Sequence, residues 1–168
     1  MSSHPAHPRG QPVAADLFRR ACAQFATGIA VVTVLDRAGA PHGMTINSFA
    51  SVSLDPALVL ICIDDRATIL PQLLAAESLA INVLAEHQSD LSSRFARKTE
   101  DRFEQLEWTT GELGSPIIAG TLAVFECTLV RSVEAGDHHI LIAAVQLAAW
   151  REARPLLYFN SSYQALGE

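Results

Sequence analysis

The sequence predicts a mainly β fold with a few peripheral helices, in which the strands form a closed antiparallel barrel. Three observations lead to this prediction. The chain has 168 residues, a length that suits one domain. It is 49% hydrophobic and 18% charged, so it can fill a core. Its apolar segments are short, rich in β-branched residues and separated by short connections, and closure into a barrel removes the exposed edges of an open sheet.

The N-terminal part predicts an arm followed by a helix. Residues 1–13 contain three of the eight prolines and few apolar side chains, so we expect a flexible arm before a domain at 14–168. From Leu17 to Phe25, apolar residues recur at three- and four-residue spacing, which is typical of an amphipathic helix. Asp16 is placed to cap this helix, and Gly28 marks its expected end.

The rest of the chain predicts several strands and two further helices. Apolar runs end at turn signals such as Asp36 to Gly39, which favours hairpin connections. The expected strands cover 29–35, 42–48, 58–63, 79–84, 122–130, 139–147 and 155–159. The segment 58–63 is continuously apolar, which indicates a strand buried on both faces. Helices are expected at 68–76 and at 88–95, the second with Ser89 as a cap.

The composition limits the classes of partner and the compartment. The chain has 12 Lys and Arg against 18 Asp and Glu, a formal charge of -6, and this balance disfavours nucleic acid and anionic membranes. Its apolar runs are much shorter than the roughly 20 residues of a spanning helix. The N-terminus lacks the apolar region of a secretory signal. Cys22, Cys62 and Cys127 suit reduced thiols, and we expect a cytoplasmic protein.

Familiar nucleotide and metal motifs are missing from the sequence. No Gly-x-Gly-x-x-Gly segment follows a predicted strand and no P-loop occurs, so a Rossmann nucleotide site is not expected. His138 and His139 have no partners at the spacing of a zinc site, so we expect no metal.

Polar side chains crowd the segment 43–56 between two strongly apolar strands. They include Thr45, Asn47, Ser48, Ser51 and Ser53. A buried polar group without a partner costs about 1 to 3 kcal/mol, so something should satisfy them. Bonds to the local backbone are one explanation. A rim of donors and acceptors around a polar, planar ligand is the other.

Short motifs along residues 15–167 resemble, in the same order, those of the flavin reductase family. They are Phe25-Ala-Thr-Gly28, His42-Gly-Met-Thr45, Asn47-Ser48-Phe49, Ser51-Val-Ser-Leu-Asp-Pro56, Asn82-Val-Leu84, Arg94-Phe-Ala96, Asp101-Arg-Phe103 and Gly136-Asp-His138. Each motif is short, and their common order makes the resemblance specific. Members of this family supply reduced flavin to two-component monooxygenases.

The resemblance implies a split β-barrel of the FMN-binding type that forms a homodimer. It implies FMN or FAD at the subunit interface, NADH or NADPH as electron donor, and a flavin-dependent oxygenase as the partner. The sequence leaves the choice between the flavins, and between the donors, open. Hydride transfer between two cofactors needs orientation more than a protein nucleophile, and no catalytic triad is present.

The resemblance also implies roles for particular residues. Thr45, Asn47 and Ser48 would lie along the isoalloxazine, with Ser51, Val52 and Ser53 nearer the ribityl chain and phosphate. His138 would lie on the nicotinamide side of the flavin as the catalytic residue. The remaining implied cofactor contacts are Cys62, Asp64, Thr68, Asn82, Arg94, Phe95 and Tyr158.

Several of these residues have a second interpretation. The basic cluster Arg94, Arg97, Lys98 and Arg102 suits either a flavin phosphate or a solvated surface. His138 could be an ordinary turn residue, and His139 is expected to face away from it because neighbours in a strand alternate. A second possible function is a flavin- or haem-binding barrel without enzyme activity, and a third is a purely structural barrel.

Overall fold

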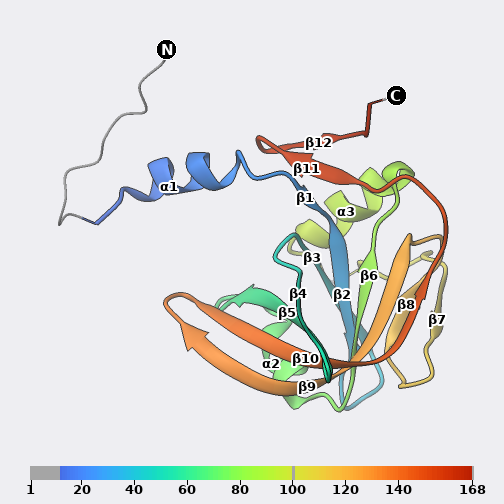
Figure 1. Cartoon of the computed structure of the whole chain (residues 1–168). Helices are drawn as coiled ribbons and strands as arrows, with labels where there is room; N and C mark the ends of the chain where they lie inside the picture. Colours follow the sequence, from blue (N-terminus) through green and yellow to red (C-terminus); the bar gives the residue numbers. More distant parts are fainter. Residues whose placement is uncertain (1–11, 100, 168) are drawn as a thin grey trace.

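The computed structural model describes residues 12–99 and 101–167, and strands dominate it (Figure 1). Seven strands of the described ranges form the main sheet: β2 (Ala30–Leu35), β3 (Pro41–Ile46), β4 (Ala50–Leu54), β5 (Ala57–Asp64), β6 (Leu79–Val83), β9 (Ala123–Ala135) and β10 (His138–Trp150). Smaller sheets pair β1 (Thr27–Gly28), β11 (Leu157–Phe159) and β12 (Ser162–Gln164), and β7 (Trp108–Thr110) with β8 (Pro116–Ile118). The helices are α1 (Ala15–Cys22), α2 (Leu70–Ala75) and α3 (Ser89–Ala96), with a 3-10 turn at Glu86–Gln88.

The main sheet curves because its two edge strands are joined by a very short link. The strand order is β3-β2-β6-β9-β10-β5-β4, and neighbouring strands are antiparallel. In a flat sheet, β3 and β4 would lie roughly 29 Å apart, at about 4.8 Å per strand. The link 47–49 lets Ile46 and Ala50 separate by at most about 14 Å. The sheet therefore closes on itself except at a gap between β3 and β4, and the prediction of a mainly β, split antiparallel barrel is confirmed.

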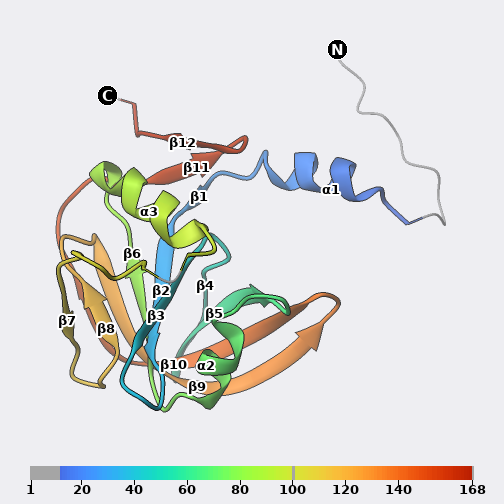
Figure 2. The same ribbon diagram turned by 180° about the vertical axis from the view of Figure 1, so that it is seen from behind.

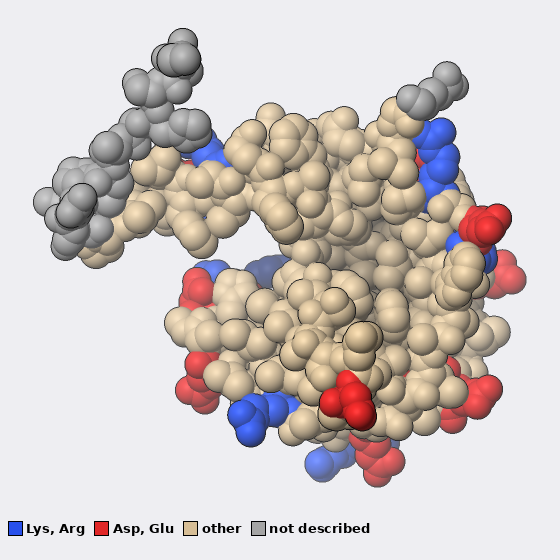
Figure 3. All heavy atoms as spheres, in the orientation of Figure 1, with Lys and Arg blue, Asp and Glu red and all other residues tan. Residues whose placement is uncertain are grey.

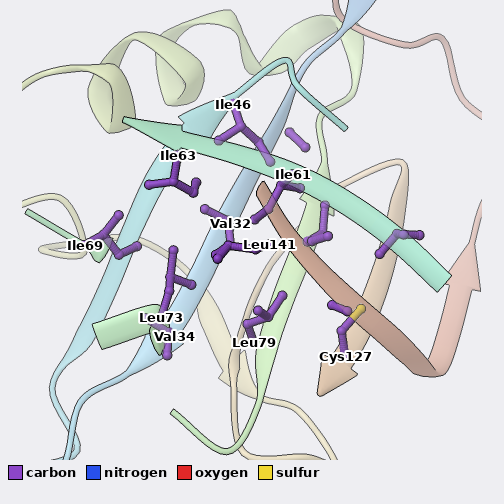
Figure 4. Close-up of a cluster of buried hydrophobic side chains, with 14 of the residues drawn as sticks. Val32, Val34, Ile46, Ile61, Ile63, Ile69, Leu73, Leu79, Cys127 and Leu141 are labelled. Carbon is purple, nitrogen blue, oxygen red and sulfur yellow. The ribbon is translucent and has the colours of Figure 1, made fainter. Parts of the chain in front are cut away.

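Two apolar cores lie on the two sides of this sheet. The main core fills the barrel with side chains from β2, β3, β5, β6, β10 and α2 (Figure 4). On the other side, α3 packs across β2 and β3, and Phe95 forms a second core with Leu84, Ile118 and Leu156 (Figure 2). Val31 and Val32 point to opposite sides and are both fully buried, so β2 is the wall between the two cores.

One face of the barrel wall is left uncovered by the chain itself. Val59, Ile61 and Ile63 of β5 are buried in the core, whereas the alternate residues are half-exposed. The prediction that this strand is buried on both faces is therefore wrong. We call the uncovered side the outer sheet face. It is formed by Leu58, Leu60, Cys62 and Asp64 of β5 and by their partners Ala144, Ile142, Ile140 and His138 of β10.

The helix ends differ from the sequence prediction. The first helix begins at Ala15 and ends at Cys22, and Asp16 lies inside its first turn, where its carboxylate pairs with Arg20 at 2.9 Å. Asp16 is therefore not a cap. Ser89 is the first residue of α3 and makes no capping bond. The second helix is shorter than predicted, at Leu70–Ala75.

The sheet extends further than the apolar runs. The strands β9 and β10 have 13 residues each, and their ladder runs on through the polar segment 131–135. The strands β1, β4, β7, β8 and β12 were not predicted, and β1 lies where the first helix was expected to end. Most of the predicted arm, residues 1–11, lies outside the described residues. Within the described ranges, none of the helices has the length and apolar character needed to cross a membrane.

Candidate functional site

Two adjoining pockets meet at the link between β3 and β4. The larger has a volume of about 270 Å³ and is lined by the segment 25–30 together with Ile46, Asn47 and Phe49. The smaller, of about 170 Å³, is lined by Thr45, Asn47 and Ser92 and by Tyr158 and Tyr163 of the C-terminal strands. Asn47 borders both pockets and is exposed. The gap in the barrel is therefore also where the chain is hollowed.

Ser48 fixes this link to the middle of β5. Its Oγ donates to the Cys62 carbonyl oxygen at 3.0 Å and accepts from the Cys62 amide at 2.9 Å. The hydroxyl thus bonds backbone, but the backbone of β5, 14 residues away, and not that of its own segment. Because these bonds tie Ser48 to β5, they also hold its neighbour Asn47 beside the outer sheet face.

The register of β5 and β10 brings His138 to the same face. Ile140 is opposite Cys62, and His138 is opposite Asp64. Residues directly opposite each other in antiparallel strands point to the same side of the sheet. His138 therefore lies on the outer sheet face, two residues or roughly 7 Å along the strand from the level of Cys62. One continuous strip is therefore formed by residues from three separate segments: Ser48 of the link, Cys62 and Asp64 of β5, and His138 of β10.

The His138 ring is held by its neighbour in the chain. Its Nδ1 lies 2.7 Å from Oδ1 of Asp137, which leaves Nε2 as the ring nitrogen available to a ligand. The bond to His138 also lowers the pKa of Asp137. His139 points to the opposite side, where Nδ1 lies 2.9 Å from the Ser132 hydroxyl, in agreement with the expected alternation.

Asp64 is engaged by Arg66 rather than free. The guanidinium donates to both carboxylate oxygens, at 3.0 and 2.8 Å, and the Arg66 amide donates at 2.8 Å. These bonds hold the pKa of Asp64 well below its ordinary value. The carboxylate is therefore ionised and paired at neutral pH, which leaves its backbone, not its side chain, for a ligand on the strip.

Cys62 provides an uncharged part of the strip. The thiol is half-buried, and burial raises its pKa. It therefore remains protonated near neutral pH and is a weak nucleophile.

Two predicted cofactor contacts are part of the interior instead. Asn82 is fully buried, and its amide donates to the Thr33 hydroxyl at 2.9 Å and to the Val31 carbonyl at 3.2 Å. Its Oδ1 accepts from the Ile118 amide at 2.9 Å. Phe95 is also fully buried, and it packs so closely on Gly43 that a Cβ there would lie 2.5 Å from its ring. Neither side chain lines either pocket, so the structure does not bring Asn82 or Phe95 together with Asn47.

The basic cluster holds backbone segments together. Arg94 donates to the carbonyl oxygens of Asp101 and Glu104, the first at 2.9 Å. Arg102 donates to the Gly43 carbonyl at 2.8 Å and to that of Arg97. Arg94 therefore has a bonding role that neither the phosphate nor the solvated-surface interpretation included.

Thr68 lies away from the strip. It is exposed and lines a separate pocket of about 710 Å³ with His42, Lys98 and Arg102. The structure therefore does not bring Thr68 together with Asn47 and His138.

The serines of β4 point to different sides. Ser51 is opposite Val59, which is in the core, whereas Ser53 is opposite Leu58 on the outer sheet face. The irregularity that separates them places Val52 between the two, with 46% of it exposed. Ser51 and Ser53 therefore cannot line one face of a ligand side by side.

The smaller pocket is closed by bonds between β3, α3 and the C-terminal strands. The Thr45 hydroxyl donates to the Ser92 carbonyl at 2.7 Å, and the Tyr163 hydroxyl donates to Ser92 Oγ at 2.9 Å. Tyr158 packs edge-on against Tyr163, with ring centres 5.7 Å apart. Ser92 carries no motif, so nothing in the sequence marked it as a wall of this pocket.

One further residue of the larger pocket was missed. Thr27 Oγ1 is buried and has no hydrogen-bond partner within the described part of the chain. A buried hydroxyl without a partner is costly, which favours a ligand that supplies one. The motif Phe25-Ala-Thr-Gly28 contained this threonine, but its unpaired state is visible only in three dimensions.

Comparison with known proteins places most of the chain in one family. Residues 22–167 match the family model described as flavin reductase like domain. FMN reductase (NADH) SmoA of Agrobacterium fabrum is 43% identical over 146 residues, which is 87% of this chain and 83% of that protein. The reductase component of the flavin-dependent trigonelline monooxygenase of Acinetobacter baylyi is 45% identical over 145 residues, which is 86% of this chain and 47% of that protein.

Solved structures of similar proteins have the same fold. The NADH:FAD oxidoreductase SgcE6 of Streptomyces globisporus, in complex with NAD and FAD fragments, superposes with a TM-score of 0.89 at 35% identity and covers 98% of both chains. The styrene monooxygenase flavin reductase of Pseudomonas putida S12 has a TM-score of 0.83 at 34% identity, covering 90% of this chain and 97% of that one. The chain spans about half the length of the first curated relatives it matches, 41%, 47% and 55%.

Proposed function

The chain belongs to the flavin reductase family, and from that premise we propose that it oxidises NADH or NADPH to reduce FMN or FAD. The reduced flavin is then supplied to a separate flavin-dependent oxygenase. This step is supported by relatives that are named as the reductase component or reductase subunit of a flavin-dependent monooxygenase. The observation that carries the proposal is the strip on the outer sheet face, where β5 and β10 bring His138 to the same side as Cys62, to which Ser48 bonds next to the two pockets at Asn47.

The residues at the pockets fit a flavin. A flavin ring needs apolar walls and a few donors and acceptors at its edge. Phe25, Ile29 and Phe49 provide apolar walls, and Asn47 and Thr27 have polar atoms without partners in the described structure. Thr45 and Tyr158, on the smaller pocket, would hold the ring edge next to Asn47.

His138 would position the electron donor. When bound, flavin supplies the acceptor for a hydride from nicotinamide. With Nδ1 held by Asp137, the His138 ring presents Nε2 on the outer sheet face, where it orients the nicotinamide or faces developing negative charge on the acceptor. The protonated Cys62 thiol beside it adds no charge that would oppose this transfer.

The outer sheet face supports a homodimer with the site at its interface. It carries half-exposed Leu60, Ile140 and Ile142, and the adjoining Val133 is 39% exposed. Figure 3 shows this side of the molecule, and its centre carries almost no charged side chains. An apolar surface of this kind is typical of a protein interface.

Anaerobic reduction assays test the proposed activity. Purified protein is mixed with FMN or FAD in large molar excess over the protein, and with NADH or NADPH at a concentration at least equal to that of the flavin. The loss of flavin absorbance is followed for all four pairs. We expect complete reduction of the added flavin in at least one pair, because a reductase that releases its product turns over many times. If no pair reacts but flavin raises the Tm, the chain is a binding protein without enzyme activity.

A further inference from the structure

The helix α1 is amphipathic, but the part of the chain that the structure describes buries none of its residues. Leu17, Phe18, Ala21 and Cys22 share one side of the helix, because they are three or four residues apart. We call this side the apolar stripe. None of the residues of α1 is buried, and Phe18 is 62% exposed. Figure 1 shows α1 projecting from the barrel beyond β1.

An isolated helix of this length does not hold itself together. The helix has eight residues, whereas free helices shorter than about 12 to 15 residues are marginal in water. Most helices of this length are stabilised by packing of the apolar side. The helix therefore needs a surface to cover the apolar stripe.

The base of α1 is anchored, so the helix is held out in a defined direction. The Asn160 amide, at the turn between β11 and β12, donates to the Ala23 carbonyl at 2.8 Å. The Gln24 side chain donates to Asn160 Oδ1 at 3.4 Å. The next strand, β1, pairs with β11. The chain leaves this anchor as an arm, and below it the surface is hollowed (Figure 3).

We propose that α1 docks on the outer sheet face of a second copy of this chain and forms a wall of that copy's site. The inference rests on the homodimer of the proposed function, and it adds the exchange of an arm. Under two-fold symmetry, each copy both donates its apolar stripe and receives its partner's, so the two uncovered apolar surfaces of the chain cover each other. The open sides of Asn47 and His138 would then face the partner's helix.

Charge complementarity favours a second copy as the occupant. Arg19 flanks the apolar stripe, three residues before Cys22. Beside His138, at the end of the outer sheet face, the β9–β10 turn carries the carboxylate of Asp137, whose side chain is 83% exposed. In this region Arg66 is already paired with Asp64. A docked stripe would therefore bring Arg19 toward the carboxylate of Asp137.

Cross-linking through the exposed Cys22 tests the exchange directly. Val133 lies on the outer sheet face, opposite Ile140, so Val133→Cys places a thiol where the arm is expected to dock. A short bis-maleimide should then give covalent dimers joined between Cys22 of one copy and the introduced thiol of the other. The position control is Leu74→Cys. Leu74 is 41% exposed and belongs to α2, a helix that packs on the main core and not on the outer sheet face. The thiol control combines Val133→Cys with Cys22→Ser, and neither control should give that link.

Two results would overturn the exchange. One is a link between Cys22 and the introduced thiol only within a single chain, and the other is no link while Cys22 reacts freely with a monovalent maleimide. This readout needs neither flavin nor NADH, so it is separate from a failure of the proposed activity.

Substitutions within α1 give a second, independent measurement. Phe18→Ser should raise the dimer dissociation constant at least tenfold in sedimentation experiments. Asp16→Ser, on the polar side of the same helix, should leave it within about twofold, because exposed ion pairs contribute little. Equal effects of the two substitutions would contradict docking through the apolar stripe.

Discussion

The two asparagines of the polar motifs lie in opposite surroundings. Asn82 is fully buried, and its amide group bonds three partners, on β2 and β8. Asn47 is exposed between two pockets and makes no side-chain hydrogen bond within the described residues. A polar side chain with all its bonds made stabilises the fold, whereas one left unpaired at a pocket is available to a ligand. This difference, which residue type does not reveal, separates the structural motifs from the site.

The largest expected effect comes from removing the interior asparagine. Asn82→Ala leaves the Ile118 amide and the Thr33 hydroxyl short of a partner in the interior. We expect the free energy of unfolding to fall by about 3 kcal/mol, which lowers the Tm by roughly 9 °C. Calorimetry measures this loss, and the flavin affinity of the folded protein should stay the same.

The same substitution at the rim is the matched control. Asn47→Ala should leave the free energy of unfolding within about 0.5 kcal/mol and weaken flavin binding. The comparison fails if Asn47→Ala destabilises the protein as much as Asn82→Ala does.

The next effect concerns the imidazole of the strip. His138→Ala should lower kcat about tenfold, equivalent to about 1.4 kcal/mol, because the nicotinamide loses its orienting partner. Flavin affinity and Tm should change little, since the ring bonds only its neighbour Asp137 in the described structure. Stopped-flow reduction and flavin titration measure the two quantities separately. A parallel loss of flavin affinity would place His138 among the binding residues instead.

A smaller effect, of mixed sign, is expected at Thr27. Thr27→Val replaces the unpaired hydroxyl by a methyl group of similar size. The flavin-free protein should become more stable by about 1 kcal/mol, because a buried polar group without a partner is removed. Flavin should bind more weakly, by roughly fivefold, if Oγ1 bonds the ligand. Tm values with and without flavin test both signs, and unchanged flavin affinity would exclude this hydroxyl from the site.

The smallest effect is a pH dependence at the end of the strip. The pKa of Asp64 is lowered in the folded chain, mainly by its bonds from Arg66. Its contribution to stability is therefore fully present above the ordinary carboxyl pKa of about 3.9. It is lost as the pH falls below that value through the folded pKa. Urea unfolding between neutral and acidic pH should show a weaker acid dependence for Asp64→Asn than for the original chain, with the two curves parallel at neutral pH.

The fold was largely predictable because its cores follow the apolar pattern. The strands that contain Val31, Ile61 and Leu141 are rich in apolar and β-branched residues, and the short turns between strands favour antiparallel pairing. Strand lengths were not predictable in the same way. The ladder of β9 and β10 continues through exposed polar residues, where pairing depends on the partner strand and not on side-chain type.

The site was predictable in part, and its limits have physical causes. The motifs located the link 47–49 and His138, which the register of β5 and β10 brings to one face. The motifs did not distinguish Phe95 and Asn82, which are buried, from residues at the pockets. Arg94 has the right chemistry for a phosphate, but it donates to backbone carbonyls seven and ten residues further along the chain. Every residue has a backbone carbonyl, so the sequence does not show which of them a side chain will bond.

The three-residue link between β3 and β4 has two structural roles. It forces the sheet to close, and it carries Asn47 and the Ser48 hydroxyl that clamps β5. A lengthened link would relax the curvature and move the pocket wall in one step, so insertions there should be poorly tolerated. The β2–β3 turn, by contrast, is exposed at residues 37–40 and carries none of the residues placed at the site. Natural or engineered diversification of this scaffold should therefore accumulate in that turn and spare the link 47–49.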